Sequence, residues 1–392
     1  MSNRMNRRIF LTQGSQAAGL LTGLFTGLFS GRRLFNSLGA TTLASSFFLD
    51  SCSTVDEYLL EEKFNLDDQI LIVGGGLAGL YLAYQLRQKR FDFRLFEGSN
   101  RFGGRIRSDQ GLDFGAGSFA KNNNLMNKLV KDFNLSTLPL NSKYEYFPAG
   151  TETLIQSLVQ RISGLMPYRH LRLQTQLISI KKNNQKYECV FETPRGTRTY
   201  SAKKVVLAIP PNQWSKVSGL LELEEMQAAK SWLASIKTEN IVKVSYMVSS
   251  STSARAASHV LTSKEGFKTS TDEFNFRQLI KKNKSQTWVE SEFKMKTAET
   301  LQDIDTLAEW LKYKTPHPPS SVKGLQSENF MDWSQVSLIQ AGAFDNAVPW
   351  PTINQLSFSM QFHIVGDFAS SKNMGTMEGC LSSVEQVLPE LI

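Results

Sequence analysis

The stretch that decides the fold is residues 70–107, ILIVGGGLAGLYLAYQLRQKRFDFRLFEGSNRFGGRIR. It opens with an apolar, β-branched run from Ile70 to Val73, which predicts a short, fully buried strand that ends at Gly74. We expect a helix over residues 77–87 and a second strand that ends at Glu97. A strand, a glycine turn, a helix and a second strand in this order are typical of a dinucleotide-binding α/β domain.

The first glycine turn has the spacing G-x-G-x-x-G at Gly74, Gly76 and Gly79. This spacing permits a tight turn, lets the backbone approach a pyrophosphate and packs the helix closely on the strand. The helix would point its first N–H groups, beginning at Leu77 and Ala78, toward the phosphates. Glycine clusters also occur in ordinary loops, so the motif alone is a weak indication.

Two further features strengthen the interpretation. Glu97 lies about twenty residues past the turn, where a carboxylate can accept hydrogen bonds from a ribose diol. A second glycine turn follows, and it can bring two guanidinium groups near the same phosphates. Its residues are Arg101, Gly103, Gly104 and Arg105.

With these residues the chain resembles the flavin amine oxidase family, which includes polyamine and L-amino-acid oxidases and has the pattern E-x(3)-R-x-G-G-R. The resemblance implies an α/β fold, with a doubly wound, Rossmann-like FAD domain and an inserted, reduced α+β substrate domain. It also implies noncovalent FAD, because Ala343 falls where monoamine oxidases attach the flavin through cysteine.

More motifs extend the resemblance along the chain. In LDFGAGSF, the residues Gly115, Ala116, Gly117 and Ser118 correspond to the family's backbone contact beneath the isoalloxazine ring, although a plain hairpin is the alternative. Residues 147–162 resemble the helix by which the family re-enters its FAD domain. The resemblance places Leu177 against the adenine through its backbone atoms.

The last motif is FHIVGDFASSKNMGTMEGCLSS, residues 362–383. Gly366 precedes Asp367, which stands where relatives usually carry glutamate, and the resemblance implies that its carboxylate holds the ribityl chain or a phosphate-bridging water. A helix is expected to begin at Met377. Its first N–H groups would face the flavin N1–C2=O edge, where reduction builds negative charge.

The residues expected on the substrate side of the flavin depart from the family. Ser249 aligns with a lysine that holds a water near N5, and Lys243 is the lysine that remains on the same strand. Phe344 and Thr376 align with the paired tyrosines that flank an amine, so one aromatic wall is missing. These four are the candidate catalytic residues, and none of them is an evident general base.

Composition limits the other classes of function. The chain has 392 residues, of which 41% are hydrophobic and 20% are charged. This length and composition are enough for two domains with a sizeable core. The four histidines and three cysteines have no spacing typical of a metal site, and buried thiols are favoured over disulfides. Without residues 1–51, which hold five arginines and one aspartate, the net charge falls from +8 to +4. That charge does not indicate a nucleic-acid partner.

The first 52 residues predict export. NRRIFL at residues 6–11 resembles a twin-arginine motif and precedes a weakly apolar, glycine-rich segment, which predicts a periplasmic protein. Residues 49–52, LDSC, resemble a lipoprotein cleavage box, so Cys52 is a candidate for lipid attachment and membrane anchoring. Two alternatives stay open: cleavage without lipidation, and a retained G-x-x-x-G membrane anchor.

We expect three parts in the chain: the export signal (1–52), a discontinuous FAD-binding domain (67–122, 147–212 and 330–392) and a substrate domain (123–146 and 213–329). The leading function is oxidation of a small amine or amino-acid-like donor by hydride transfer to flavin N5, with oxygen or a quinone as electron acceptor. A desaturase or isomerase-like flavoprotein acting on an apolar substrate is the second hypothesis. A noncatalytic flavin-binding module is the third.

Overall fold

The structure is a computed structural model, and it describes the residues in these ranges: 69–109, 111–164, 170–227, 229–230, 232, 240–248, 260–262, 276–282, 287–295, 330–332, 361–370 and 373–392. The predicted export signal, Cys52, Ser249, Ala343 and Phe344 all lie outside these ranges. Lys243 lies inside them, on a strand described by its backbone pairing.

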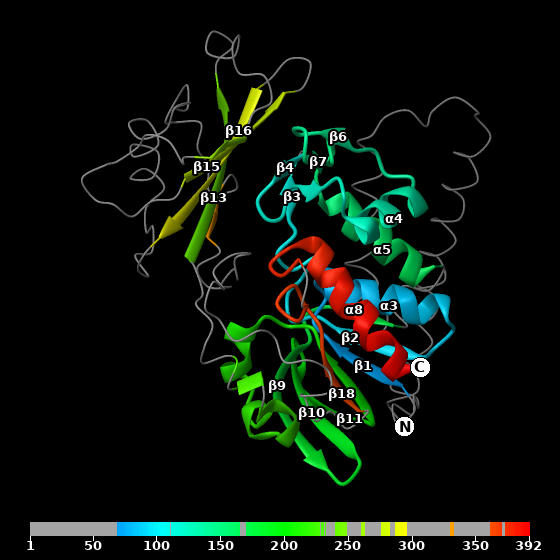
Figure 1. The fold of residues 1–392 in the computed structure, drawn as a ribbon. Coiled ribbons are helices and arrows are strands. Elements are labelled where there is room, and N and C mark those ends of the chain that lie inside the picture. The colour runs from blue at the N-terminus through cyan, green and yellow to red at the C-terminus, as the bar shows by residue number, and fades with distance from the viewer. Residues whose placement is uncertain are drawn as a thin grey trace, which may run out of the picture. The chain divides into compact units, whose positions relative to one another are not determined.

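A five-stranded parallel sheet (Figure 1) has the order β18-β12-β1-β2-β8 and lies between the helices and the strands described next. Its strands are short and mostly apolar, because a parallel sheet is covered on both faces. Their bounds are Ile70–Val73 for β1, Phe93–Phe96 for β2, Leu171–Arg172 for β8, Lys204–Leu207 for β12 and Phe362–Ile364 for β18.

Helices pack against one another on one side of this sheet (Figure 1): α3 (Leu77–Gln88) contacts both α5 (Glu152–Ser163) and α8 (Met377–Leu391). α4 (Asn124–Asp132) also packs on α8. The predicted helix over residues 147–162 begins later, at Glu152, because Pro148 and Gly150, the latter with φ of +90°, form a turn before it.

An antiparallel meander covers the other face of the sheet (Figure 1). It consists of β9 (Gln176–Asn183), β10 (Lys186–Thr193) and β11 (Gly196–Ala202). Leu71 and Val73 of β1 share a buried cluster with meander residues such as Tyr187 and Phe191. Side chains alternate along a strand, so the other residues of β1 point away from the meander. The three 3₁₀ helices that follow β12, Pro211–Lys216, Leu220–Glu222 and Glu224–Met226, add Trp214 to this cluster.

Two small antiparallel sheets follow the glycine turns. One pairs β3 (Ser108–Asp109) with β4 (Leu112–Asp113), and the other has the order β5-β7-β6. The bounds in the second sheet are Phe119–Ala120 for β5, Leu138–Pro139 for β6 and Tyr144–Tyr146 for β7.

A second five-stranded sheet, antiparallel in every pairing, has the order β14-β15-β16-β13-β17. Its bounds are Asn240–Val248 for β13, Val260–Thr262 for β14, Phe276–Lys282 for β15, Thr287–Met295 for β16 and Phe330–Asp332 for β17. Alternating apolar and polar residues at 241–250 and 286–295 predict two strands, which correspond to β13 and β16, whereas β14 and β15 are not predicted. Residues 330–332, assigned above to the FAD-binding domain, pair with β13 of this sheet.

Within the described ranges, the helices are either too short or too polar to cross a bilayer.

Candidate functional site

The first glycine turn joins β1 to α3 at the carboxyl end of the parallel sheet. Gly74 has φ of +110°, and its N–H donates to the carbonyl of Phe96 on the neighbouring strand (2.8 Å). A side chain at Gly74 would lie 2.6 Å from the carbonyl oxygen of Ala208, and one at Gly79 would collide with the carbonyl oxygen of Gly74. Both positions therefore require glycine for close packing of helix and strand.

Gly76 differs from its two neighbours in the motif. It is the N-cap of α3, with φ of −74°, and a Cβ placed on it would meet no atom within 4 Å. The helix has no side-chain cap and no acidic residue in its first turn. A helix start without a side-chain cap and beside open space is suited to bind an anion.

Glu97 lies just past the end of β2 and turns back onto this glycine turn. Its Oε2 accepts from the backbone N–H of Gly75 (2.6 Å) and its Oε1 from that of Ser99 (2.8 Å). Each carboxylate oxygen keeps further capacity to accept a hydrogen bond. The predicted contact with a ribose diol stays a prediction, made from a carboxylate whose position is set by the turn.

The second glycine turn packs directly on the first. The N–H of Gly103 donates to the carbonyl of Gly75 (2.8 Å), and a Cβ on Gly104 would lie 3.2 Å from the Cα of Gly76. Gly103 and Gly104 both have positive φ, +110° and +54°. The two motifs, predicted separately, thus form one backbone surface around the start of α3.

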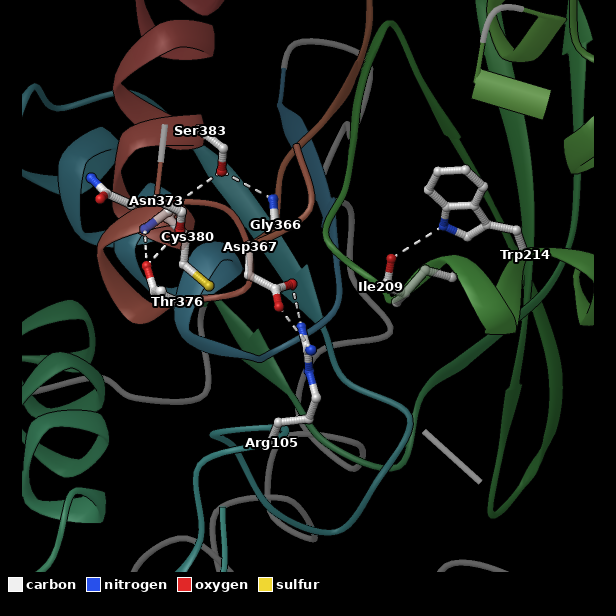
Figure 2. Close-up of polar contacts among 10 residues, drawn as sticks. Arg105, Ile209, Trp214, Gly366, Asp367, Asn373, Thr376, Cys380 and Ser383 are labelled. Atoms are coloured by element: carbon white, nitrogen blue, oxygen red, sulfur yellow. Dashed lines mark hydrogen bonds and ion pairs between the residues drawn. The ribbon is translucent and has the colours of Figure 1, made fainter. Parts of the chain in front are cut away.

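Arg101 and Arg105 have different partners. The guanidinium of Arg101 donates to three carbonyl oxygens of its own loop. Arg105 instead reaches across to Asp367, beyond the closing strand (Figure 2), with Nη1 at 2.9 Å from Oδ2 and Nη2 paired with Oδ1. Burial lowers the pKa of Arg105, but Asp367 outweighs burial and the net pKa is raised. In this structure Arg101 is thus held by its own loop and Arg105 by Asp367, and the expected contact of both guanidinium groups with one phosphate site stays a prediction.

The segment from Gly115 to Ser118 follows β4 and packs on Arg105. The N–H of Ala116 donates to the carbonyl of Arg105 (3.2 Å), and a side chain on Gly115 would collide with that same carbonyl. A Cβ on Gly117 would lie 2.8 Å from the Cβ of Asp113. This backbone is thus held tightly, as the predicted contact beneath a flavin ring requires.

Asp113 supports this segment from inside the core, where it is completely buried. Its Oδ1 accepts from the hydroxyl of Ser108 (2.5 Å) and from the N–H of Thr151 at the start of α5 (2.8 Å). A buried carboxylate joins the small β3–β4 sheet to α5 in this way.

The start of α8 is built by Thr376, the N-cap residue. Its hydroxyl accepts from the N–H of Gly379 (3.1 Å) and donates to the carbonyl of Asn373 (2.5 Å), as Figure 2 shows. The N–H of Gly375 donates to the carbonyl of Asp367 (3.0 Å). The helix begins at Met377 as predicted, whereas Thr376 has a capping role that the aligned tyrosine position did not indicate.

Glu378 is the residue of this region that sequence reasoning missed. Its side chain is 5% exposed, and its two oxygens accept from the N–H groups of Leu125 (3.0 Å) and Met126 (2.9 Å). The acid of α8's first turn therefore caps α4, which we had assigned to the substrate domain. An acid in the G-x-x-E-G motif was the available signal, but nothing local indicates its partner.

The remaining predicted residues are distributed as follows. Leu177 is buried, and the preceding residue, Gln176, would contact a Cβ on Gly98, one position past Glu97. Leu177 therefore lies near the predicted ribose contact. Lys243 is in β13, in register with Glu292 of β16 and Met331 of β17.

The described cysteines are free thiols. Burial raises the pKa of Cys189 to about 12. Burial also raises the pKa of the Cys380 thiol, and the charge of Asp367 raises it further. Across the ranges that the structure describes, no group of three His, Cys, Asp or Glu residues is placed to hold a metal ion.

Comparison with known proteins supports the same fold. The family described as NAD(P)-binding Rossmann-like domain matches residues 72–133. Achacin from Lissachatina fulica is 32% identical over 113 residues, which are 25% of this chain and 21% of achacin. The chain thus matches about a fifth of the length of this curated relative.

Solved structures match over most of the chain. Cyclohexylamine oxidase from Brevibacterium oxydans has a TM-score of 0.60 and 12% identity, and the match covers 83% of this chain and 98% of that chain. Putrescine oxidase bound to putrescine has a TM-score of 0.56 and 12% identity, with 83% and 99% covered. The prediction of an α/β, Rossmann-like fold of the amine oxidase type is confirmed.

Proposed function

We propose that this protein is an FAD-dependent oxidoreductase of the amine oxidase type. The observation that carries the proposal is the meeting of two glycine turns at the start of α3, where Gly103 bonds to Gly75 and Gly76 borders open space. The amine oxidase fold of the chain supports the same cofactor. When bound, FAD supplies the hydride acceptor of the reaction.

The described residues fit a flavin dinucleotide better than a simple nicotinamide cofactor. The helix start at α3 and the carboxylate of Glu97 suit pyrophosphate and ribose, which both cofactors contain. The second glycine turn, the Arg105–Asp367 pair and the start of α8 extend the binding surface to segments that simple nicotinamide folds lack. We therefore assign the pyrophosphate to the α3 side and the flavin end to the Gly115–Ser118 and Met377 side.

The residues near the flavin end would act by binding and orientation. The N–H groups that begin α8 would stabilise negative charge at the flavin pyrimidine edge, by roughly 0.3–1 kcal/mol. The Gly115–Ser118 backbone, packed on Arg105, would support the ring from one side. Among these groups we assign none as a general base, since hydride transfer from a neutral amine can proceed without one.

We further propose a small amine or amino-acid-like donor, with oxygen or a quinone-type acceptor. The fold neighbours named cyclohexylamine oxidase and putrescine oxidase support an amine as donor. Export to the periplasm, with optional anchoring through Cys52, is proposed from the sequence of residues 1–52. Loading of FAD in the cytoplasm would be compatible with twin-arginine export, because that route carries folded proteins.

Anaerobic flavin bleaching tests this function. The purified holoprotein, yellow from bound FAD, is mixed with a panel of amines and amino acids, and its flavin absorbance is followed before and after re-aeration. At least one donor is expected to bleach the flavin, and oxygen or an added quinone to restore the colour. A protein that dithionite reduces but no donor does would contradict the oxidase assignment.

A second candidate is a desaturase or isomerase-like flavoprotein with an apolar substrate. The observation that favours it is Thr376, whose hydroxyl is engaged in capping α8 where amine oxidases place an aromatic wall. Bleaching by an apolar donor, together with failure of every amine, would select this alternative.

Lys243 provides a test of the substrate side. Lys243→Met should slow flavin reduction about tenfold or more if its ammonium assists the reaction near N5, since general acid–base contributions reach that size. FAD affinity should stay unchanged. Lys281→Met on β15, a strand separated from β13 by β16, is the matched control. Equal reduction rates in both variants would exclude Lys243 from the reaction.

A further inference from the structure

The guanidinium of Arg101 forms hydrogen bonds with the backbone of its own loop, residues 101–106. Nη1 donates to the carbonyl oxygens of Phe102 (3.2 Å) and Ile106 (2.9 Å), and Nη2 donates to that of Gly104 (2.7 Å). Both N–H groups of Nη1 are thereby used within the protein. The three bonds close residues 101–106 around one planar side chain.

The loop of residues 101–106 is also the segment that packs against the start of α3. Gly103 donates to the carbonyl of Gly75 (2.8 Å), and a Cβ on Gly104 would approach Gly76 to 3.2 Å. The hydrogen bond from the N–H of Ile106 to the carbonyl of Gly103 (3.0 Å) closes the turn between them. A change in the loop would therefore change the backbone surface around the open space at Gly76.

The same loop carries Arg105. Arg105 lies between Gly104 and Ile106, whose carbonyl oxygens both accept from Arg101. The carbonyl of Arg105 itself accepts from the N–H of Ala116 (3.2 Å). Its guanidinium pairs with Asp367. The loop thus connects the helix start, the Gly115–Ser118 backbone and the closing segment.

We propose that Arg101 is a positioning residue, which acts on the dinucleotide through this loop and is not itself a ligand of the phosphates. Its planar fork holds the second glycine turn against the first and sets the direction of Arg105. The part of this inference that concerns the dinucleotide rests on the proposed FAD function.

The proposal is tested by separating the shape of Arg101 from its charge. A guanidinium has donors fixed in one plane, whereas a lysine ammonium is a point charge that cannot serve three carbonyls in that arrangement. Arg101→Lys should therefore resemble Arg101→Gln, although it keeps the charge. Arg107→Lys and Arg107→Gln are the controls, because Arg107 is a neighbouring cation whose charge acts on Arg101 but which lies outside residues 101–106.

The first measurement is the dissociation constant of FAD from the refolded apoprotein, determined by flavin fluorescence at low and at high salt. Both Arg101 variants should bind FAD about tenfold more weakly, or worse, with the salt dependence of the wild type. The Arg107 variants should bind as the wild type does. Wild-type affinity in Arg101→Lys, with a weaker and less salt-dependent Arg101→Gln, would mean a phosphate contact and would overturn the proposal.

The second measurement needs no cofactor. Hydrogen exchange in the apoprotein should be at least about tenfold faster for the amides of residues 103–106 in Arg101→Lys than in Arg107→Lys. Equal exchange rates in the two variants would show that Arg101 does not hold the loop and would overturn the proposal. If the wild type binds no FAD, the proposed function fails, and exchange still decides whether Arg101 holds the loop.

Gly104→Ala covers the case in which an Arg101 variant does not fold. This change leaves Arg101 in place but adds a methyl group where φ is +54° and Gly76 is close. It should weaken FAD binding to the same degree as Arg101→Lys. Unchanged FAD affinity in Gly104→Ala would show that the placement of the loop does not matter, and would overturn the proposal.

Discussion

Two charged pairs of similar burial lie in different regions of the described fold. Arg105 and Asp367, with side chains 23% and 6% exposed, lie beside the glycine turns. Lys182 and Glu225, 33% and 2% exposed, join β9 of the meander to the last 3₁₀ helix, and the hydroxyl of Tyr187 on β10 also donates to Glu225 (2.5 Å). Each pair joins segments that are distant in the sequence.

The two pairs differ in what their backbones contact. The carbonyls of Arg105 and Asp367 accept hydrogen bonds from Ala116 and Gly375, in the two segments proposed to hold the flavin. Glu225 instead lies among the 3₁₀ helices that close an apolar cluster around Trp214. A buried ion pair therefore says little about function by itself, and its main-chain neighbours decide whether a binding surface depends on it.

On the dinucleotide side of this comparison, the largest expected effect is that of a substitution at Gly79. Gly79→Ala places a methyl group against the carbonyl of Gly74 and should lower the free energy of unfolding by roughly 3 kcal/mol. It should also weaken FAD binding about a hundredfold, because a shift of the turn moves the start of α3. Chemical denaturation and FAD titration measure the two effects.

Gly76→Ala is the matched control within the same turn. Its methyl group meets no protein atom within 4 Å, and φ of −74° suits alanine. The free energy of unfolding should change by less than about 0.5 kcal/mol, while FAD affinity falls about tenfold because the methyl group takes up space meant for the pyrophosphate. Unchanged FAD affinity would place the dinucleotide elsewhere.

Paired substitutions of the two acids compare the pairs directly. Asp367→Ala leaves a largely buried Arg105 without its partner, which should cost about 3 kcal/mol of stability and weaken FAD binding about tenfold. Glu225→Ala should cost about 1–2 kcal/mol, since Lys182 is partly exposed, and leave FAD affinity unchanged. An equal loss of FAD affinity in both variants would remove the distinction between the pairs.

The helix starts and turns of the dinucleotide side were largely predictable, because local pattern specifies them. The strand from Ile70 to Val73 and the helix start at Met377 agree with the structure to the residue. The capping role of Glu378 was not predictable, since its partner Leu125 is 253 positions away. The loop contacts of Arg101 were missed for another reason, namely that the motif suggested a ligand contact.

Glu378→Gln has a smaller expected effect. It replaces one of two accepting oxygens by an amide nitrogen and removes a negative charge from the start of α4, which should cost about 1 kcal/mol. Hydrogen exchange at Leu125 and Met126 should become faster. Glu385→Gln, on the same helix but bonded to Tyr81, should leave exchange in α4 unchanged. Equal exchange in both variants would mean that Glu378 does not hold α4.

The smallest effect concerns acid stability under the meander. Burial by itself raises the pKa of Glu225, but hydrogen bonds from Lys182 and Tyr187 outweigh burial, and the net pKa is lowered. A carboxyl whose pKa is lowered by folding stabilises the native state above its unfolded pKa of about 4.3. That stabilisation is lost as the pH falls through the lower, folded value. The stability difference between wild type and Glu225→Gln, about 1 kcal/mol at neutral pH, should therefore shrink in acid.

Glu188→Gln is the control. It breaks the more exposed pair with Lys181 and should change stability by less than about 0.5 kcal/mol. A difference for Glu225→Gln that is the same at neutral and acid pH would show that its ionised form is not what stabilises this side of the sheet, and the two pairs would then differ in chemistry as well as in position.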